Sequence, residues 1–124
     1  MSNQSGKVQT VLGLLAPEAL GFTLTHEHLL VDVECNFTMP DEATARGMVD
    51  QAVNVGNVAD VVKYWTTMKD NTHLYDEGMA VEELMRYRLA GGDSVVDVTS
   101  IGIARDPLAL ARISRATGVQ IVMG

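Results

Sequence analysis

FTLTHEHLLV, residues 22–31, is the stretch that decides the fold, and it predicts a buried strand carrying two histidines. Side chains of a strand alternate between its two faces, so that residues i and i+2 point the same way. One face of the predicted strand therefore carries Phe22, Leu24, His26 and His28. Two imidazoles on one face can bind one cation from the same side, and further ligands must then come from other segments.

The two histidines, His26 and His28, have two interpretations at this point. They are either satisfied core histidines or metal ligands, and zinc-like ions suit neutral imidazole. A structural zinc site takes four protein ligands, often cysteines. The sequence has one cysteine, Cys35, which argues against a site of that kind. We expect Cys35 to be a small buried or loop residue rather than a nucleophile.

Composition limits the class of partner. The 124 residues are 47% hydrophobic and 20% charged, a balance typical of one globular domain. The formal net charge of −7 argues against a surface that binds nucleic acid or an anionic membrane. The sequence has no apolar run long enough to span a bilayer, and its first ten residues, MSNQSGKVQT, contain no apolar signal core. We therefore expect a cytoplasmic protein with no nucleic-acid or membrane partner.

The segments on either side of the first strand are less regular. Residues 7–21 fit a short hairpin or cap, and residues 32–78 form a long connection interrupted by Pro and Gly. Within this connection, residues 41–53 and 57–64 each fit a short helix. Such a connection in a compact domain is usually functional or mobile. Its aromatic side chains either pin it to the rest of the protein or contact a substrate; they are Tyr64, Trp65, His73 and Tyr75.

Regular elements return after residue 78. The pattern predicts a helix over 79–90, a strand over 94–99, a helix over 107–117 and a strand over 119–123. Strands that alternate with helices pair in parallel through right-handed crossovers. In such folds the site lies at the carboxyl ends of the strands. His26 and His28 lie toward that end of the first strand, which favours metal ligation over a core role.

Charged residues on these later elements have expected partners. Glu82 and Arg86 are four residues apart in the predicted helix, in the orientation that favours an ion pair. Asp97 lies inside the second strand and is either a hydrogen-bonded structural carboxylate or part of a site; we favour the structural role. Asp106, followed by proline, begins the next helix, and Gly118 ends it.

Three segments in this order resemble the phosphotriesterase family of the amidohydrolase superfamily, and in particular its bacterial phosphotriesterase-related branch. They are THEHLL at residues 25–30, VVDVTSIGIARDP at 95–107 and RATGVQIVMG at 115–124. The likeness runs from about residue 8 to residue 124 and is weaker across 32–78. The His-x-His motif alone is weakly specific, but the three segments together make a strong match.

The resemblance implies a zinc-dependent hydrolase built on a (β/α)8 TIM barrel. Such a barrel holds two divalent metals, usually zinc, and a metal-bound hydroxide attacks a phosphotriester, lactone or carboxylic ester. The first-strand pair of the family binds the more buried metal, and that role carries over to His26 and His28. The family's other ligands are a carboxylated lysine on the fourth strand, histidines on the fifth and sixth, and an aspartate on the eighth. None of them has a counterpart among the three strands predicted here.

We therefore interpret the fold class as α/β, with the first three β/α units of a truncated TIM barrel. Residues 1–124 would be the N-terminal part of a metal-dependent hydrolase, because a whole barrel needs about 200 residues or more. One alternative is a non-catalytic remnant or interaction fragment that associates through open strand edges, for example as a homo-oligomer. Another is a small stand-alone α/β binding domain with one labile metal. The 124 residues alone are not expected to catalyse hydrolysis efficiently, since two ligands hold a metal weakly.

Overall fold

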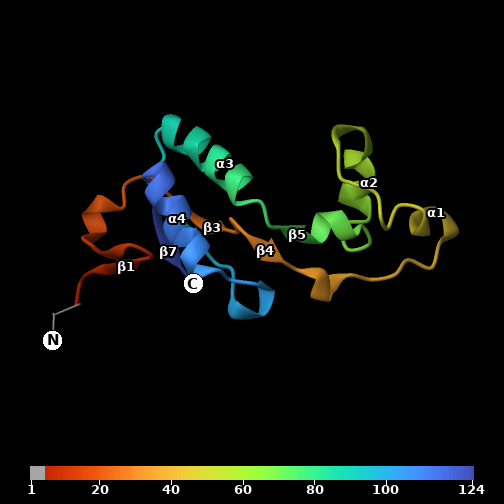
Figure 1. Cartoon of the computed structure of the whole chain (residues 1–124), viewed down its shortest axis with the longest axis horizontal. Coiled ribbons are helices and arrows are strands. Elements are labelled where there is room, and N and C mark those ends of the chain that lie inside the picture. The colour runs from red at the N-terminus through yellow and green to blue at the C-terminus, as the bar shows by residue number, and fades with distance from the viewer. Residues whose placement is uncertain (1–4) are drawn as a thin grey trace. The chain divides into compact units, whose positions relative to one another are not determined.

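A computed structural model describes residues 5–124, which form two compact units (Figure 1). The first unit comprises residues 5–30 and 76–124, and the second comprises Val31–Tyr75. The strands are β1 (Val8–Thr10), β2 (Gly13–Leu15), β3 (Thr23–Glu27), β4 (Val31–Asp32), β5 (His73–Leu74), β6 (Ser94–Asp97) and β7 (Gln120–Met123). The helices are α1 (Ala43–Arg46), α2 (Val58–Lys63), α3 (Glu77–Leu89) and α4 (Pro107–Thr117). Within residues 5–124, no helix is both long enough and apolar enough to cross a membrane.

The first unit is built on a parallel sheet of three strands in the order β3-β6-β7. Helix α3 precedes β6 and helix α4 precedes β7, so strands and helices alternate as predicted. The α/β fold class is confirmed. Because the strands are parallel, their carboxyl ends meet at one edge of the sheet.

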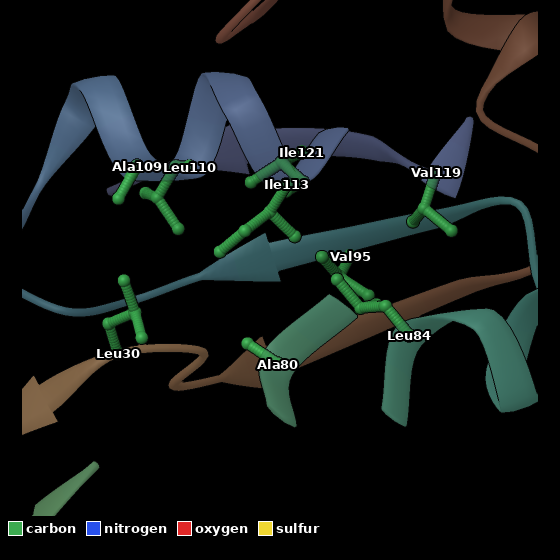
Figure 2. Close-up of a cluster of buried hydrophobic side chains, with 9 residues drawn as sticks. All are labelled: Leu30, Ala80, Leu84, Val95, Ala109, Leu110, Ile113, Val119 and Ile121. Atoms are coloured by element: carbon green, nitrogen blue, oxygen red, sulfur yellow. The ribbon is translucent and has the colours of Figure 1, made fainter. Parts of the chain in front are cut away.

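The core of the first unit lies between the sheet and its two helices (Figure 2). Its buried side chains come from α3, β6, α4 and β7 and from the end of the β3 segment; they are Leu30, Ala80, Leu84, Val95, Ala109, Leu110, Ile113, Val119 and Ile121. The two helices also touch each other through a bidentate ion pair, in which Arg112 Nη2 lies 2.8 Å from Glu77 Oε2. Full burial of such aliphatic side chains contributes about 1.5–3 kcal/mol each, so this cluster supplies much of the driving force for folding.

Local signals place both helices of this unit. The side chain of Asp106 accepts hydrogen bonds from the N–H groups of Leu108 and Ala109 at the start of α4, and Gly118 ends that helix with φ 73°. Both features were predicted. The predicted pair of Glu82 with Arg86 is wrong, because the guanidinium of Arg86 instead contacts Glu83 at 2.7 Å. Glu82 and Glu83 lie four and three residues before Arg86, so either carboxylate is within about one helical turn of it. The Nη1 of Arg86 bonds the carboxylate of Glu83.

The N-terminal segment forms the predicted hairpin. Strands β1 and β2 pair antiparallel, and the backbone N–H of Val11 donates to the carbonyl of Ile121 on β7 at 2.9 Å. The backbone N–H groups of Gln120 and Gly124 donate to carbonyls of the β6 segment. The backbone carbonyl of Ile121 points the other way, to the edge of β7 that is not paired with β6. The hairpin therefore meets part of the outer edge of β7.

The second unit contains little regular structure. Strands β4 and β5 pair antiparallel over two residues each. Helices α1 and α2 are shorter than the helices predicted over 41–53 and 57–64, since α1 buries only Ala45 and α2 buries no residue. Without an apolar face to bury, short helices are marginal. Cys35 is exposed on a short 3-10 helix, Glu34–Asn36, so of the two expected positions, buried or in a loop, it does not take the buried one.

Two aromatic side chains of the second unit, Trp65 and Tyr75, are exposed, whereas Tyr64 and His73 are half-buried. Tyr75 stacks on His73 with ring centroids 4.6 Å apart, and its hydroxyl donates to Asp32. Trp65 is 56% exposed. The contacts of Tyr75 tie β5 to the strand that pairs with it, which supports the pinning role for that one residue.

Candidate metal centre

The first main strand is shorter and more open than predicted. Phe22–Val31 was expected to be one buried strand, but β3 ends at Glu27 and Val31 belongs to β4. Leu24 is 37% exposed and Phe22 is 66% exposed. The physical reason is that β3 is an edge strand of the sheet formed by the described residues, so it has a neighbour on one side only.

A shift of register interrupts the predicted alternation of faces. Leu24 pairs with Val95 and Glu27 pairs with Asp97, so three steps along β3 match two steps along β6. One extra residue in a strand exchanges the faces of everything beyond it. Leu24 lies before the shift and shares the face of its partner Val95, whereas the residues after the shift lie on exchanged faces. The prediction that one face runs unbroken from Phe22 to His28 is therefore wrong.

The two histidines nevertheless come together. The rings of His26 and His28 have centroids 5.5 Å apart and are inclined at 75°, edge to face. His26 is exposed and is the fourth residue of β3, whereas His28 is half-buried and follows the last residue of that strand. Both lie at the carboxyl end of β3, the edge at which parallel α/β folds place their sites. Two imidazoles this close can contact one cation.

The half-buried His28 has a partner from the neighbouring strand. Its Nδ1 lies 2.9 Å from the hydroxyl oxygen of Thr99, two residues beyond the end of β6. Thr99 is only 1% exposed. This hydrogen bond engages Nδ1, so Nε2 is the ring nitrogen of His28 that has no hydrogen-bond partner among the described residues.

The buried carboxylate of Asp97 supports this arrangement. Its Oδ1 accepts the N–H of Thr99 and its Oδ2 accepts the N–H of Leu29, both at 2.9 Å. Asp97 is fully buried, and within the described residues every buried side-chain polar atom has a partner. The structural role predicted for Asp97 is confirmed, since both of its oxygens bind backbone.

The loop after β6 adds an apolar and a strained residue to the same edge. Ile101 begins a short 3-10 helix and is 83% exposed. Ala104 has φ 67°, and among residues 5–124 it is the one non-glycine residue with a positive φ. Strained backbone is frequent at functional sites, and this loop directly follows the carboxyl end of β6.

The part of the chain that the structure describes contributes two metal donors at this edge and no more. No third His, Cys, Asp or Glu among residues 5–124 joins a group that could hold a metal ion. A metal held here needs further ligands from outside this group. Sequence reasoning missed Thr99, although a hydroxyl just past the end of a strand parallel to the histidine strand was a usable signal.

Comparison with known proteins gives relatives of one kind. The chain is 45% identical over 130 residues to an N-acetyltaurine hydrolase of Tetraodon nigroviridis, and the match covers 100% of this chain and 36% of the relative. It is 39% identical over 125 residues to the N-acetyltaurine hydrolase of Homo sapiens, with the same coverage. The chain thus spans about a third of the length of the curated relatives it matches.

Solved structures give the same picture. A resiniferatoxin-binding protein from Rhodobacter sphaeroides matches with a TM-score of 0.93 and 38% identity, over 97% of this chain and 34% of that chain. A lactonase from Listeria monocytogenes matches with a TM-score of 0.61 and 27% identity, over 94% of this chain and 27% of that one. The model of the phosphotriesterase family matches residues 6–124, and because this is nearly the whole chain, the protein belongs to the phosphotriesterase family.

Proposed function

We propose that the complete protein is a metal-dependent hydrolase of small molecules and that His26 and His28 are its first two metal ligands. Family membership supports hydrolysis, since the similar proteins include N-acetyltaurine hydrolases, a lactonase and organophosphorus hydrolases. The observation that carries the proposal is the approach of the two imidazoles at the carboxyl end of β3.

The spacing of the two rings fits joint ligation. Zinc binds imidazole nitrogen at about 2.0–2.1 Å in tetrahedral geometry, which puts two ligating ring centroids roughly 5 Å apart. The rings of His26 and His28 have centroids 5.5 Å apart. When bound, a zinc-like ion acts as a Lewis acid that polarises the bond to be broken and lowers the pKa of water. His26 and His28 would hold and orient that ion, but two ligands alone are too few to bind it tightly.

The three-stranded sheet supports a place within a larger barrel. We infer that β3, β6 and β7 are the first three strands of a (β/α)8 barrel whose remaining ligands come from later strands. The match to about a third of each relative supports this, as does the exposure of Leu24 on the edge strand. Residues 32–78 would then be the connection that follows the first strand of the barrel.

The relatives suggest which substrates to test first. N-acetyltaurine contains an amide bond, and the relatives named for its hydrolysis are up to 45% identical to this chain. The lactonase and the organophosphorus hydrolases are 25–29% identical in this segment. We therefore propose N-acetyltaurine as the first substrate, and lactones, carboxylic esters and phosphotriesters as the second group.

The test uses the intact protein isolated from its source, with its mass determined first. Zinc content and the rates of taurine release and of lactone and phosphotriester hydrolysis are measured before and after chelation and after return of Zn²⁺. We expect activity that chelation removes and Zn²⁺ restores. His26→Ala and His28→Ala should each lower both metal content and hydrolysis by at least an order of magnitude, as expected for the loss of a ligand.

The control is a histidine that we do not expect to bind the metal. His73 lies in the second unit and stacks on Tyr75, so His73→Ala should leave metal content unchanged. Full metal content and full activity in His26→Ala and His28→Ala would overturn the ligand assignment. Hydrolysis that survives chelation in the wild type would overturn metal dependence itself.

A further inference from the structure

The hydroxyl of Thr99 is the one polar side-chain group that the described residues place on the His28 ring. The distance from Nδ1 to Oγ1 is 2.9 Å, and the two residues are 71 positions apart in the chain. Thr99 is 1% exposed, so water does not compete freely for its hydroxyl. This hydrogen bond therefore helps to fix the orientation of the His28 ring.

The direction of this hydrogen bond decides which nitrogen can bind a metal. A neutral imidazole carries one N–H, and a ligating nitrogen must offer a lone pair. If Nδ1 of His28 donates its proton to Thr99, the lone pair is on Nε2, which is then free to ligate. If the hydroxyl donates to Nδ1 instead, the proton is on Nε2 and ligation through Nε2 is blocked.

The support of Thr99 is unusually complete. Asp97 accepts the N–H of Thr99 with one oxygen and the N–H of Leu29, the neighbour of His28, with the other. One buried carboxylate thus fixes the backbone on both sides of the contact between Thr99 and His28. By contrast, His26 is exposed, and among the described residues its ring contacts the His28 ring but has no hydrogen bond.

We propose that Thr99 is a positioning residue: it accepts the Nδ1–H of His28, and Asp97 fixes its backbone, so that Nε2 of His28 is preset for ligation before the metal arrives. The proposal rests on the function proposed above. It divides the pair into a preset ligand, His28, and an exposed ligand, His26, which the metal itself must order. Such outer hydrogen bonds orient metal-binding histidines in general.

The first experiment needs no metal and no activity. The tautomer of His28 is read from two-bond ¹⁵N–¹H couplings of the metal-free chain, at a pH well above the ordinary histidine pKa of about 6.5. We expect the Nδ1–H form in the wild type and in Thr99→Ser, which keeps the hydroxyl. Thr99→Val keeps the volume and removes the acceptor, so it should lose this preference. An Nε2–H form in the wild type would overturn the proposal, even if a variant failed to fold.

A second threonine provides the matched control. Thr117 is 6% exposed, its hydroxyl donates to Ile113 O at 2.9 Å, and it lies at the end of α4, on the side of the sheet where β7 begins. Thr117→Val makes the same chemical change away from the histidines. It should leave the tautomer of His28 as it is in the wild type, and a change equal to that of Thr99→Val would overturn the specific role of Thr99.

Zn²⁺ affinity, measured by titration calorimetry, separates the two proposals. Thr99→Val should bind Zn²⁺ about 10–100-fold more weakly than the wild type, and Thr99→Ser should restore most of the affinity. A wild type that binds Zn²⁺ through His26 and His28, with Thr99→Val binding equally well, would overturn the role of Thr99 alone. A wild type that binds no Zn²⁺, even as the intact protein, would overturn the proposed function and with it the ligation role of His28.

Discussion

Asp97 accepts the backbone N–H of Leu29 at 2.9 Å and so joins the end of β6 to the residue that follows the His-x-His motif. Its second oxygen accepts the N–H of Thr99. Both oxygens of a fully buried carboxylate thus accept hydrogen bonds from backbone N–H groups. The sheet ladder ends at Glu27, so beyond it the Asp97 side chain connects the residue after His28 to β6.

The substitution Asp97→Asn should therefore be costly although it changes few atoms. An amide offers one acceptor oxygen, so one of the two backbone N–H groups would face an NH₂ group. Leaving a buried donor unpaired costs about 1–3 kcal/mol, and we expect the free energy of unfolding, measured by urea denaturation, to fall by that amount. The control is Asp106→Asn, because one oxygen of Asp106 accepts both of its hydrogen bonds and Asn caps helices equally well. Equal losses for the two variants would contradict this account of Asp97.

The ion pair between α3 and α4 should make stability depend on pH. Hydrogen bonds from Arg112 lower the pKa of Glu77 below its ordinary value of 4.5. A carboxyl whose pKa is lower in the folded state stabilises the fold at pH values above its ordinary pKa. That contribution is lost as the pH falls through the lowered value, since protonated Glu77 no longer pairs with the guanidinium.

Arg112→Met tests this dependence without touching the first turn of α3. We expect the melting temperature of Arg112→Met to lie below that of the wild type at neutral pH, and the two to converge as the pH falls through the lowered pKa of Glu77. The effect is modest, because both side chains are partly exposed, at 55% and 36%. Arg86→Met removes a more exposed pair within one helix and should lower the melting temperature less. A constant difference across the whole pH range would show that packing of the Arg112 stem, not its charge, is responsible.

Local signals in the sequence were enough to place the later elements of the first unit. The Asp106–Pro107 start and the Gly118 end of α4 are decided by residues next to each other, and the apolar runs of β6 and β7 have no competing pattern. The same holds for the hairpin of β1 and β2. These elements were predictable because each is determined by the backbone preferences of a few adjacent residues.

Non-local contacts were not predictable in the same way. The shift of register in β3 is a property of its pairing with β6, so the alternation rule applied to one strand alone gave the wrong face for Leu24. The contact of Thr99 with His28 joins residues 71 positions apart. The second unit buries few side chains in its helices, which leaves sequence periodicity with little to detect.

In the second unit, Tyr75 should control the acidity of Asp32. The Tyr75 hydroxyl donates to the carboxylate of Asp32, the N–H of Glu34 donates at 2.8 Å, and both hydrogen bonds lower the pKa of Asp32 below its ordinary 3.8. In Tyr75→Phe the carboxyl resonance of Asp32, followed by ¹³C NMR, should titrate closer to 3.8. Tyr64→Phe, in the same unit, should leave that titration unchanged. A titration of Asp32 that is the same in Tyr75→Phe and the wild type would contradict the hydrogen bond.

Alanine substitutions at two glycines, Gly21 and Gly118, allow the cost of backbone strain to be distinguished from the cost of a steric clash. Gly21 and Gly118 both have positive φ, 61° and 73°, so Ala at either position takes on left-handed strain of about 1–2 kcal/mol. A Cβ at Gly118 would meet no atom within 4 Å, whereas a Cβ at Gly21 would lie 2.2 Å from Asp93 Oδ2 and 2.7 Å from Asp93 Cβ. Asp93 would then have to move, and its Oδ2 accepts the N–H of Phe22 at the start of the β3 segment.

Gly21→Ala should therefore destabilise the chain more than Gly118→Ala. We expect Gly118→Ala to cost about 1 kcal/mol in the free energy of unfolding, and Gly21→Ala to cost that amount plus about 1 kcal/mol for the lost hydrogen bond. The double variant Gly21→Ala with Asp93→Ala removes the clash with the Asp93 carboxylate and leaves only the 2.7 Å approach to its Cβ, so the further loss should be smaller than that of Asp93→Ala in the wild-type background. Additive losses for Gly21→Ala and Asp93→Ala would show that the two residues do not interact and would contradict this account of the entry into β3.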